Sequence, residues 1–95
     1  MKHKNFYVVA YDIGDDNRRL KTGKILESMG TRVNYSVFEC FLTDLQYKKM
    51  CLQLEKVVIR NEDKVIIYPL TLDCFTRIKY IPAYKQKEAD KIVVI

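Results

Sequence analysis

The sequence predicts an α+β domain of the ferredoxin-like type, in which one antiparallel sheet with βαββαβ order carries both helices on one face. Stretches rich in β-branched and aromatic residues, which are typical of strands, occur at 6–12, 31–42 and 64–70. Segments with a helical spacing of apolar residues lie between them, and the connections are short. A chain of 95 residues has room for one such domain.

The first predicted strand, residues 6–12 (FYVVAYD), is apolar on both faces. Successive side chains of a strand point to opposite faces, which separates Phe6, Val8 and Ala10 from Tyr7, Val9 and Tyr11. Such a strand belongs in the middle of a sheet that is covered on both sides. If the helices cover the first set, the second set forms an exposed apolar patch. A partner such as a second copy of the chain would cover that patch, and a homodimer is therefore expected.

A helix is predicted after this strand. Residues 14–17 (GDDN) supply a turn and an N-cap, and Gly30 ends the helix after Met29. The apolar side of the helix carries Thr22, Ile25, Leu26 and Met29. Gly23 lies inside the helix, at a cost of about 1 kcal/mol relative to Ala.

Residues 31–42 (TRVNYSVFECFL) form either one strand or two short strands with a break at 34–36, where no Gly or Pro marks a turn. The second helix has the clearest pattern in the chain. Thr43 and Gln46 match a capping box, and apolar residues recur at helical spacing over 47–58.

The next strand is predicted at 64–70 (KVIIYPL), near a sheet edge because of Pro69. Residues 76–81 (TRIKYI) alternate like a further strand. We therefore expect a ferredoxin-like domain over 1–81 and a C-terminal extension over 82–95. The apolar end of that extension (KIVVI) is predicted to add as an extra strand to the sheet edge of the partner protomer.

Composition restricts the partners. A net charge of +5 and a pI near 9.1 describe a folded basic protein whose first candidate partner is nucleic acid, although many small basic proteins bind no polyanion. No apolar run approaches the ~18 residues of a membrane span, so no membrane partner is expected. Three cysteines without CxxC or Cys/His spacing indicate neither a disulfide framework nor a zinc site, which predicts a reduced, cytoplasmic location.

Asp12 is the first candidate for chemistry, because it ends an apolar strand just before a helix with a basic start. Mg²⁺ prefers oxygen ligands and is often held by one or two carboxylates, waters and substrate phosphate. One Asp per chain is too few, whereas a two-fold axis would bring two together. The alternative from the residues alone is a turn or cap residue. Asp15 and Asp16 are interpreted as acidic residues at a helix N-terminus.

Four basic residues are candidates either for phosphate binding or for a solvated basic face: Arg18, Arg19, Lys21 and Arg32. Tyr11 and Phe38 are candidates for stacking on bases, with core packing as the competing interpretation. Ser36 either orients a ligand or marks the break between strands.

Three segments together resemble a known family: YVVAYDIGDDNRR at 7–19, TRVNYSVFEC at 31–40 and VIIYPL at 65–70. Over residues 5–81 the chain is similar to the CRISPR-associated small endonuclease family, the smaller of the two universal CRISPR adaptation proteins. The resemblance implies a ferredoxin-like homodimer whose sheets pack face to face and whose C-terminal strand crosses to the partner.

The resemblance also implies that Asp12 of each protomer meets its mate at the dimer axis and is the catalytic residue. The two would hold one Mg²⁺ (or Mn²⁺) ion, shared between the protomers, for phosphodiester cleavage. Supporting roles are implied for Tyr11, Arg19, Lys21, Arg32 and Phe38. Lys21 stands where an Arg can occur in relatives, and Asn34 replaces an expected Gln.

The family implies two functions of different classes. The first is a metal-dependent endonuclease that cuts single-stranded RNA or double-stranded DNA and serves spacer acquisition in antiviral defence. The alternative is a non-catalytic, DNA-binding dimer that bridges subunits of the CRISPR integrase. A third option, an RNA-cleaving toxin of similar fold outside CRISPR systems, would be indicated by a neighbouring antitoxin gene. We expect the first.

Overall fold

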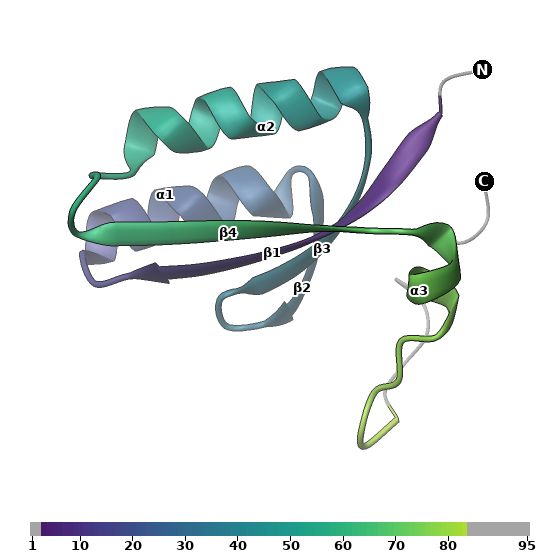
Figure 1. Cartoon of the computed structure of the whole chain (residues 1–95). Coiled ribbons are helices and arrows are strands. Elements are labelled where there is room, and N and C mark those ends of the chain that lie inside the picture. The colour runs from purple at the N-terminus through teal and green to yellow at the C-terminus, as the bar shows by residue number, and fades with distance from the viewer. Residues whose placement is uncertain (1–2, 84–95) are drawn as a thin grey trace.

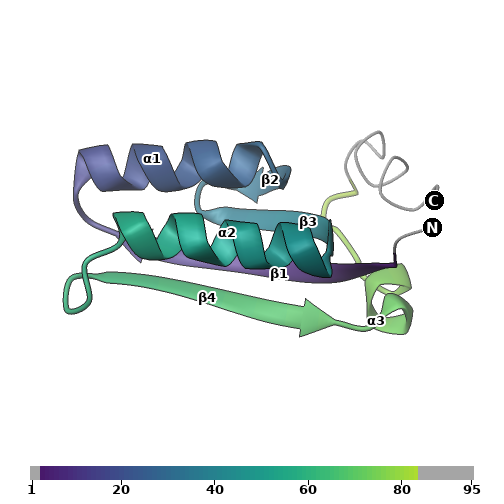
Figure 2. The same ribbon diagram turned by 90° about the horizontal axis from the view of Figure 1, so that it is seen from above.

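The computed structural model describes residues 3–83 and has a four-stranded antiparallel sheet with two long helices on one face (Figures 1 and 2). The strands are β1 (Lys4–Ile13), β2 (Gly30–Asn34), β3 (Val37–Thr43) and β4 (Asp63–Leu70), in the spatial order β2-β3-β1-β4. The helices are α1 (Asp16–Glu27), α2 (Asp44–Val57) and the short α3 (Leu72–Thr76). This arrangement confirms the predicted ferredoxin-like fold.

Side-chain caps begin both long helices where the sequence predicts them. The Asp15 carboxylate accepts a hydrogen bond from the backbone amide of Arg18 at 2.9 Å, which satisfies a donor at the start of α1. At the start of α2, the Gln46 amide donates to Thr43 Oγ1 at 3.2 Å and the Thr43 amide donates to Gln46 Oε1 at 2.8 Å. The predicted capping box is therefore confirmed.

The segment 31–42 forms two strands rather than one. A turn at Tyr35 and Ser36 separates β2 from β3, and a register shift lies between Arg32 and Asn34. The shift marks an irregularity of the ladder, of the kind that re-aims side chains beside a turn.

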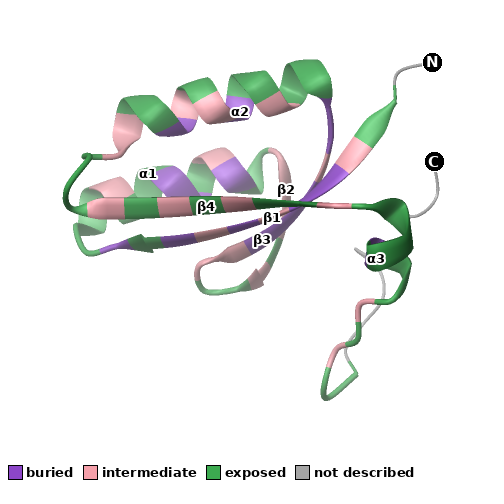
Figure 3. Ribbon diagram, in the orientation of Figure 1, coloured by how far each residue is buried: buried purple, intermediate pink, exposed green. Residues whose placement is uncertain are grey.

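The core lies between the sheet and the two long helices. Its buried members come from the two central strands and from α1 and α2: Tyr7, Val9, Tyr11, Ile13, Leu26, Phe38, Cys40, Leu42, Met50 and Leu54. Figure 3 shows the burial of β1 and β3 at the centre of the sheet. Within residues 3–83, no helix combines the length and the apolar character that crossing a membrane requires.

The helices cover the opposite face of β1 from the one considered in the sequence analysis. Tyr7, Val9 and Tyr11 point into the core, so the other set, which ends in Asp12, lies on the open face. The prediction that Tyr7, Val9 and Tyr11 form an exposed patch is therefore wrong, because all three are core residues. The physical reason is that a carboxylate at the end of the buried set would lose its hydration without a partner.

The predicted strand at 76–81 is also wrong. A short helix, α3, forms after β4 because Thr71 Oγ1 accepts a hydrogen bond from the Cys74 amide at 3.1 Å. No strand follows up to residue 83, the last one described. The extra strand predicted at the end of the chain falls within 84–95 and lies outside the described residues.

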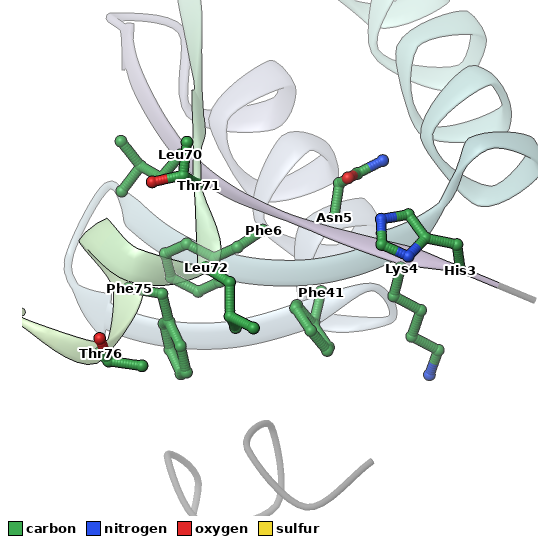
Figure 4. A pocket seen from close by; sticks show the side chains of 10 residues that line it. All are labelled: His3, Lys4, Asn5, Phe6, Phe41, Leu70, Thr71, Leu72, Phe75 and Thr76. Atoms are coloured by element: carbon green, nitrogen blue, oxygen red, sulfur yellow. The ribbon is translucent and has the colours of Figure 1, made fainter.

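Phe75 packs α3 against the sheet, and residues 77–81 continue as turn and irregular backbone rather than as the predicted strand. Its ring centroid lies 4.4 Å from that of Phe6 and 6.2 Å from that of Phe41, on the open face of the sheet (Figure 4). A pocket of about 440 Å³ opens beside these rings. The contacts of the Phe75 ring with the two other rings stabilise α3 at this place, and the ring covers one end of the open face.

Candidate metal and nucleic-acid site

Asp12 lies near the end of the central strand β1, on the face of the sheet that the long helices leave open. It is exposed, and in the strand register it is opposite Lys64 of β4. Arg19 braces the turn that follows, because its guanidinium donates to the backbone carbonyls of Ile13 at 3.0 Å and Gly14 at 3.1 Å. The strand end therefore presents a solvent-facing carboxylate on a held backbone.

Arg18 joins the start of α1 to the turn before β4. Its Nε donates to Asp63 Oδ2 at 2.7 Å and its Nη2 donates to Asp63 Oδ1 at 3.2 Å and to Glu62 at 3.2 Å. The hydrogen bond from Arg18 lowers the pKa of the Asp63 carboxyl, and the Ile59 amide adds a second donor at 2.8 Å. This pairing gives Arg18 a structural role; its contact with nucleic acid stays a prediction.

Arg32 lies over the ring of Phe38, with its guanidinium carbon 4.6 Å from the ring centroid. It also pairs with Glu27 at 3.1 Å and donates to the Tyr35 carbonyl. Tyr11 donates its hydroxyl to the same carbonyl at 3.3 Å. The fold thus brings Tyr11, Arg32 and Phe38 together at the turn between β2 and β3.

Tyr11 and Phe38 belong to the core. Tyr11 is 7% exposed and Phe38 is 0% exposed, and their rings stack with centroids 6.3 Å apart. Of the two interpretations given by the sequence, core packing describes both rings in this chain. Their stacking on bases stays untested.

Lys21 and Ser36 complete the predicted set. Lys21 is exposed on α1, and Ser36 lies half-buried in the turn between β2 and β3, where its carbonyl accepts from the Tyr11 amide at 3.0 Å. The structure supports the strand-break interpretation of Ser36.

A groove of about 420 Å³ lies between α1 and the β2–β3 turn. It is lined by Tyr11, Asp16, Arg19, Leu20, Gly23, Lys24, Glu27, Arg32 and Tyr35. Lys24 and Tyr35 are groove residues that no sequence pattern marks as functional. The available signal was Gly23: a glycine inside an amphipathic helix often marks a place where something else approaches closely.

One chain alone supplies little for a metal ion. Among residues 3–83, no three His, Cys, Asp or Glu side chains gather into a group that could hold one. The chemistry of Asp12 nevertheless fits a hard cation, because Mg²⁺ keeps several waters and needs only one or two protein carboxylates. A site with two carboxylates would take the second from Asp12 of another copy of the chain.

The four-stranded antiparallel sheet with two long helices on one face defines a small α+β protein of the ferredoxin-like class. The sequence profile of the family described as "CRISPR associated protein Cas2" matches residues 5–78. The chain therefore belongs to the Cas2 family of CRISPR-associated proteins.

Relatives with assigned names agree with this family assignment. "CRISPR-associated endoribonuclease Cas2 3" of Synechocystis sp. is 43% identical over 72 residues, which cover 76% of this chain and 78% of the relative. "CRISPR-associated endoribonuclease Cas2 1" of Chloroflexus aurantiacus is 42% identical over 77 residues, which cover 80% of this chain and 83% of the relative. These names confirm, for the family, the expected nuclease function.

Solved structures share the fold. A hypothetical protein from Thermus thermophilus aligns with a TM-score of 0.69 and 40% identity, covering 72% of this chain and 83% of that chain. A chain of a structure described as a partial Cas6-RT-Cas1–Cas2 complex aligns with a TM-score of 0.69 and 25% identity, covering 82% of this chain and 91% of that chain. The predicted family and fold are both confirmed.

Proposed function

We propose that this protein is a CRISPR-associated endonuclease that hydrolyses phosphodiester bonds of RNA or DNA during spacer acquisition, with Asp12 as its catalytic residue. The observation that carries the proposal is the position of Asp12: exposed, near the end of the central strand, on the open face of the sheet. The names of the relatives support the reaction class. They favour a nuclease over the alternative of a purely architectural dimer.

A homodimer is part of this proposal. Phe75 covers one end of the open face, but Ile66 and Tyr68 of β4 remain 40% and 50% exposed on the part nearer Asp12. Exposed apolar side chains on a sheet face favour a second copy as cover. Two copies related by a two-fold axis there would bring their Asp12 carboxylates toward each other.

Asp12 of each protomer would hold a shared Mg²⁺ or Mn²⁺ ion through its carboxylate oxygens. Such an ion stabilises charge on a phosphate and lowers the pKa of a bound water. Arg19 keeps the strand end in place through its bonds to Ile13 and Gly14. Lys21 and Arg32 would attract the phosphate backbone, which makes the affinity dependent on salt.

The remaining partners follow from the family. The complex that contains Cas1 with Cas2 supports an integrase subunit as a partner. The C-terminal extension 82–95 would add a strand to the partner protomer. We place the protein in the cytoplasm, because its three cysteines, Cys40, Cys51 and Cys74, are free thiols.

The test compares the wild-type protein with Asp12→Asn and Asp12→Ala on single-stranded RNA and on duplex DNA, with Mg²⁺, with Mn²⁺ and with chelator. We expect cleavage by the wild type to require the metal and to fall at least about a hundredfold in both variants, with unchanged thermal unfolding. A spacer-uptake assay on the same variants distinguishes the catalytic role from the architectural one, because an architectural dimer would still support uptake without cleavage. Undiminished cleavage by Asp12→Ala would overturn the assignment of this residue.

A further inference from the structure

Tyr35 is the most exposed large apolar side chain in the part of the chain between residues 3 and 83, at 90%. It stands at the turn between β2 and β3 and lines the groove beside α1. It also lines a second hollow of about 340 Å³, together with Arg32, Val33 and Asn34. An aromatic ring left in water contributes little to folding, and its faces stay accessible to a partner.

The backbone of Tyr35 is held from several sides. Its carbonyl accepts hydrogen bonds from the hydroxyl of the buried Tyr11 at 3.3 Å and from the guanidinium of Arg32. Its amide donates to the Asn34 side-chain oxygen at 2.7 Å. The buried Tyr11 and the exposed Arg32, which lies over the Phe38 ring, therefore fix the main chain of a residue whose own ring faces solvent. A ring that projects from a held backbone loses little further backbone entropy when it binds a flat partner.

The surroundings of the ring carry a small excess of positive charge. Three cations line the groove, Arg19, Lys24 and Arg32, against two anions, Asp16 and Glu27. Arg19 and Arg32 pair with the two anions, which leaves Lys24 as the excess charge. The groove thus favours a polyanion weakly through charge, and most of the affinity would have to come from the ring.

We propose that Tyr35 is a stacking platform for an unpaired base of single-stranded nucleic acid, with Lys24 contacting the adjoining phosphate. This subsite deepens the proposed function, on which it rests, by naming the form of the substrate. Stacking of a base on an aromatic side chain requires an accessible base face, which a duplex does not offer. The groove volume of about 420 Å³ lies in the range of small-molecule sites.

The test measures binding, in EDTA, of the full chain to a short single-stranded oligonucleotide with one fluorescent 2-aminopurine, as RNA and as DNA, and to the matching duplex. We expect Tyr35→Ala to weaken single-strand binding about tenfold and to abolish quenching of the probe. Tyr35→Phe should keep both, because it keeps the ring. Duplex affinity should change less than about twofold. Leu45→Ala, a solvent-facing apolar residue of α2 that is 68% exposed, is the matched control.

Salt dependence separates the two residues. Lys24→Gln should reduce the slope of log affinity against log salt by about 0.7, the value for one phosphate contact on a single strand, whereas Tyr35→Ala should leave the slope unchanged. Unaltered single-strand binding by Tyr35→Ala, or an equal loss on duplex, overturns the subsite. Because these measurements need no cleavage, a wild-type protein that binds through Tyr35 yet never cuts would refute the nuclease and retain the subsite.

Discussion

Gly23 of α1 lies directly against the guanidinium of Arg32: a Cβ atom at position 23 would be 2.9 Å from Arg32 Nη2 and 3.4 Å from the Tyr11 hydroxyl. The glycine therefore leaves room for the two side chains that hold the Tyr35 carbonyl. Glycine destabilises a helix by about 1 kcal/mol relative to Ala. At position 23 this cost accompanies the close approach of the Arg32 guanidinium.

Gly23→Ala should displace Arg32 while leaving the fold intact. The helix gains up to about 1 kcal/mol from the better helix former, and the contact at 2.9 Å is to the far end of a flexible side chain, which can move. We expect an unchanged or slightly higher melting temperature together with about threefold to tenfold weaker binding of single-stranded oligonucleotide. Thermal unfolding and fluorescence anisotropy measure the two quantities.

Gly14→Ala is the matched control, because nothing lies within 4 Å of a Cβ atom there. It should leave single-strand affinity at the wild-type value. Equal losses in both variants would show that the effect of Gly23→Ala does not arise from Arg32.

Most of the fold could be predicted because each element carries a local signal. The capping box at Thr43 and Gln46 depends on residues three apart, and so does the cap at Asp15. The face of β1 that the helices cover could not be predicted from local signals, because both sets of its side chains are apolar. α3 was missed for a similar reason: Phe75 packs on Phe6, which is far away in sequence.

The residue types of the candidate site could be predicted from the sequence, but the residues with which they pair could not. Arg18 has the charge of a phosphate ligand, yet its carboxylate partner Asp63 lies 45 positions further on. Tyr11 faces the core or the solvent according to which face of β1 the helices cover, and no local signal decides that. Tyr35 was not singled out because its exposure follows from the turn between β2 and β3, which no Gly or Pro marks.

Arg18→Gln should destabilise the fold rather than remove a phosphate contact. The bidentate pair with Asp63 lowers the pKa of that carboxyl, so its stabilisation is present above the unfolded pKa, near 3.8, and is lost as the pH falls through the lower folded pKa. We expect a melting temperature several degrees lower at pH 7, with the difference from wild type shrinking below pH 3.8. Differential scanning calorimetry at a series of pH values measures this difference in melting temperature.

Arg60→Gln serves as the control, because Arg60 is exposed in the turn before β4 and carries the same charge. Its melting temperature should match the wild type. If Arg18→Gln kept full stability and lost affinity for nucleic acid, the phosphate role predicted from the sequence would be the correct one.

Phe75→Ala should cost about 3 kcal/mol in the free energy of unfolding, since it removes a buried ring from the cluster with Phe6 and Phe41. Leu72→Ala, in the same short helix but 62% exposed, should cost less than about 0.5 kcal/mol. Urea unfolding followed by circular dichroism compares the two. Similar small costs for both would mean that α3 does not cover the open face in solution.

Glu39 of β3 is 6% exposed on the open face, and the Tyr80 hydroxyl donates to its two oxygens at 2.8 and 2.7 Å. Burial raises the pKa of this carboxyl, and the hydrogen bond from Tyr80 opposes that rise only in part. The folded state therefore holds the proton more tightly than the unfolded state. The contribution of Glu39 to stability is greatest below the unfolded pKa, near 4.5, and is lost as the pH rises through the folded pKa.

Glu39→Gln should remove this pH dependence while keeping an oxygen that accepts from Tyr80. We expect the free energy of unfolding of the variant to rise relative to wild type as the pH increases from 4.5 toward 8. Glu55→Gln, at an exposed position of α2, should show no such trend. Urea unfolding at a series of pH values measures the difference, and because Asp63 titrates identically in all three proteins, its opposite effect cancels. A difference between Glu39→Gln and wild type that stays constant across this range would mean that Glu39 ionises as freely in the folded chain as in the unfolded one.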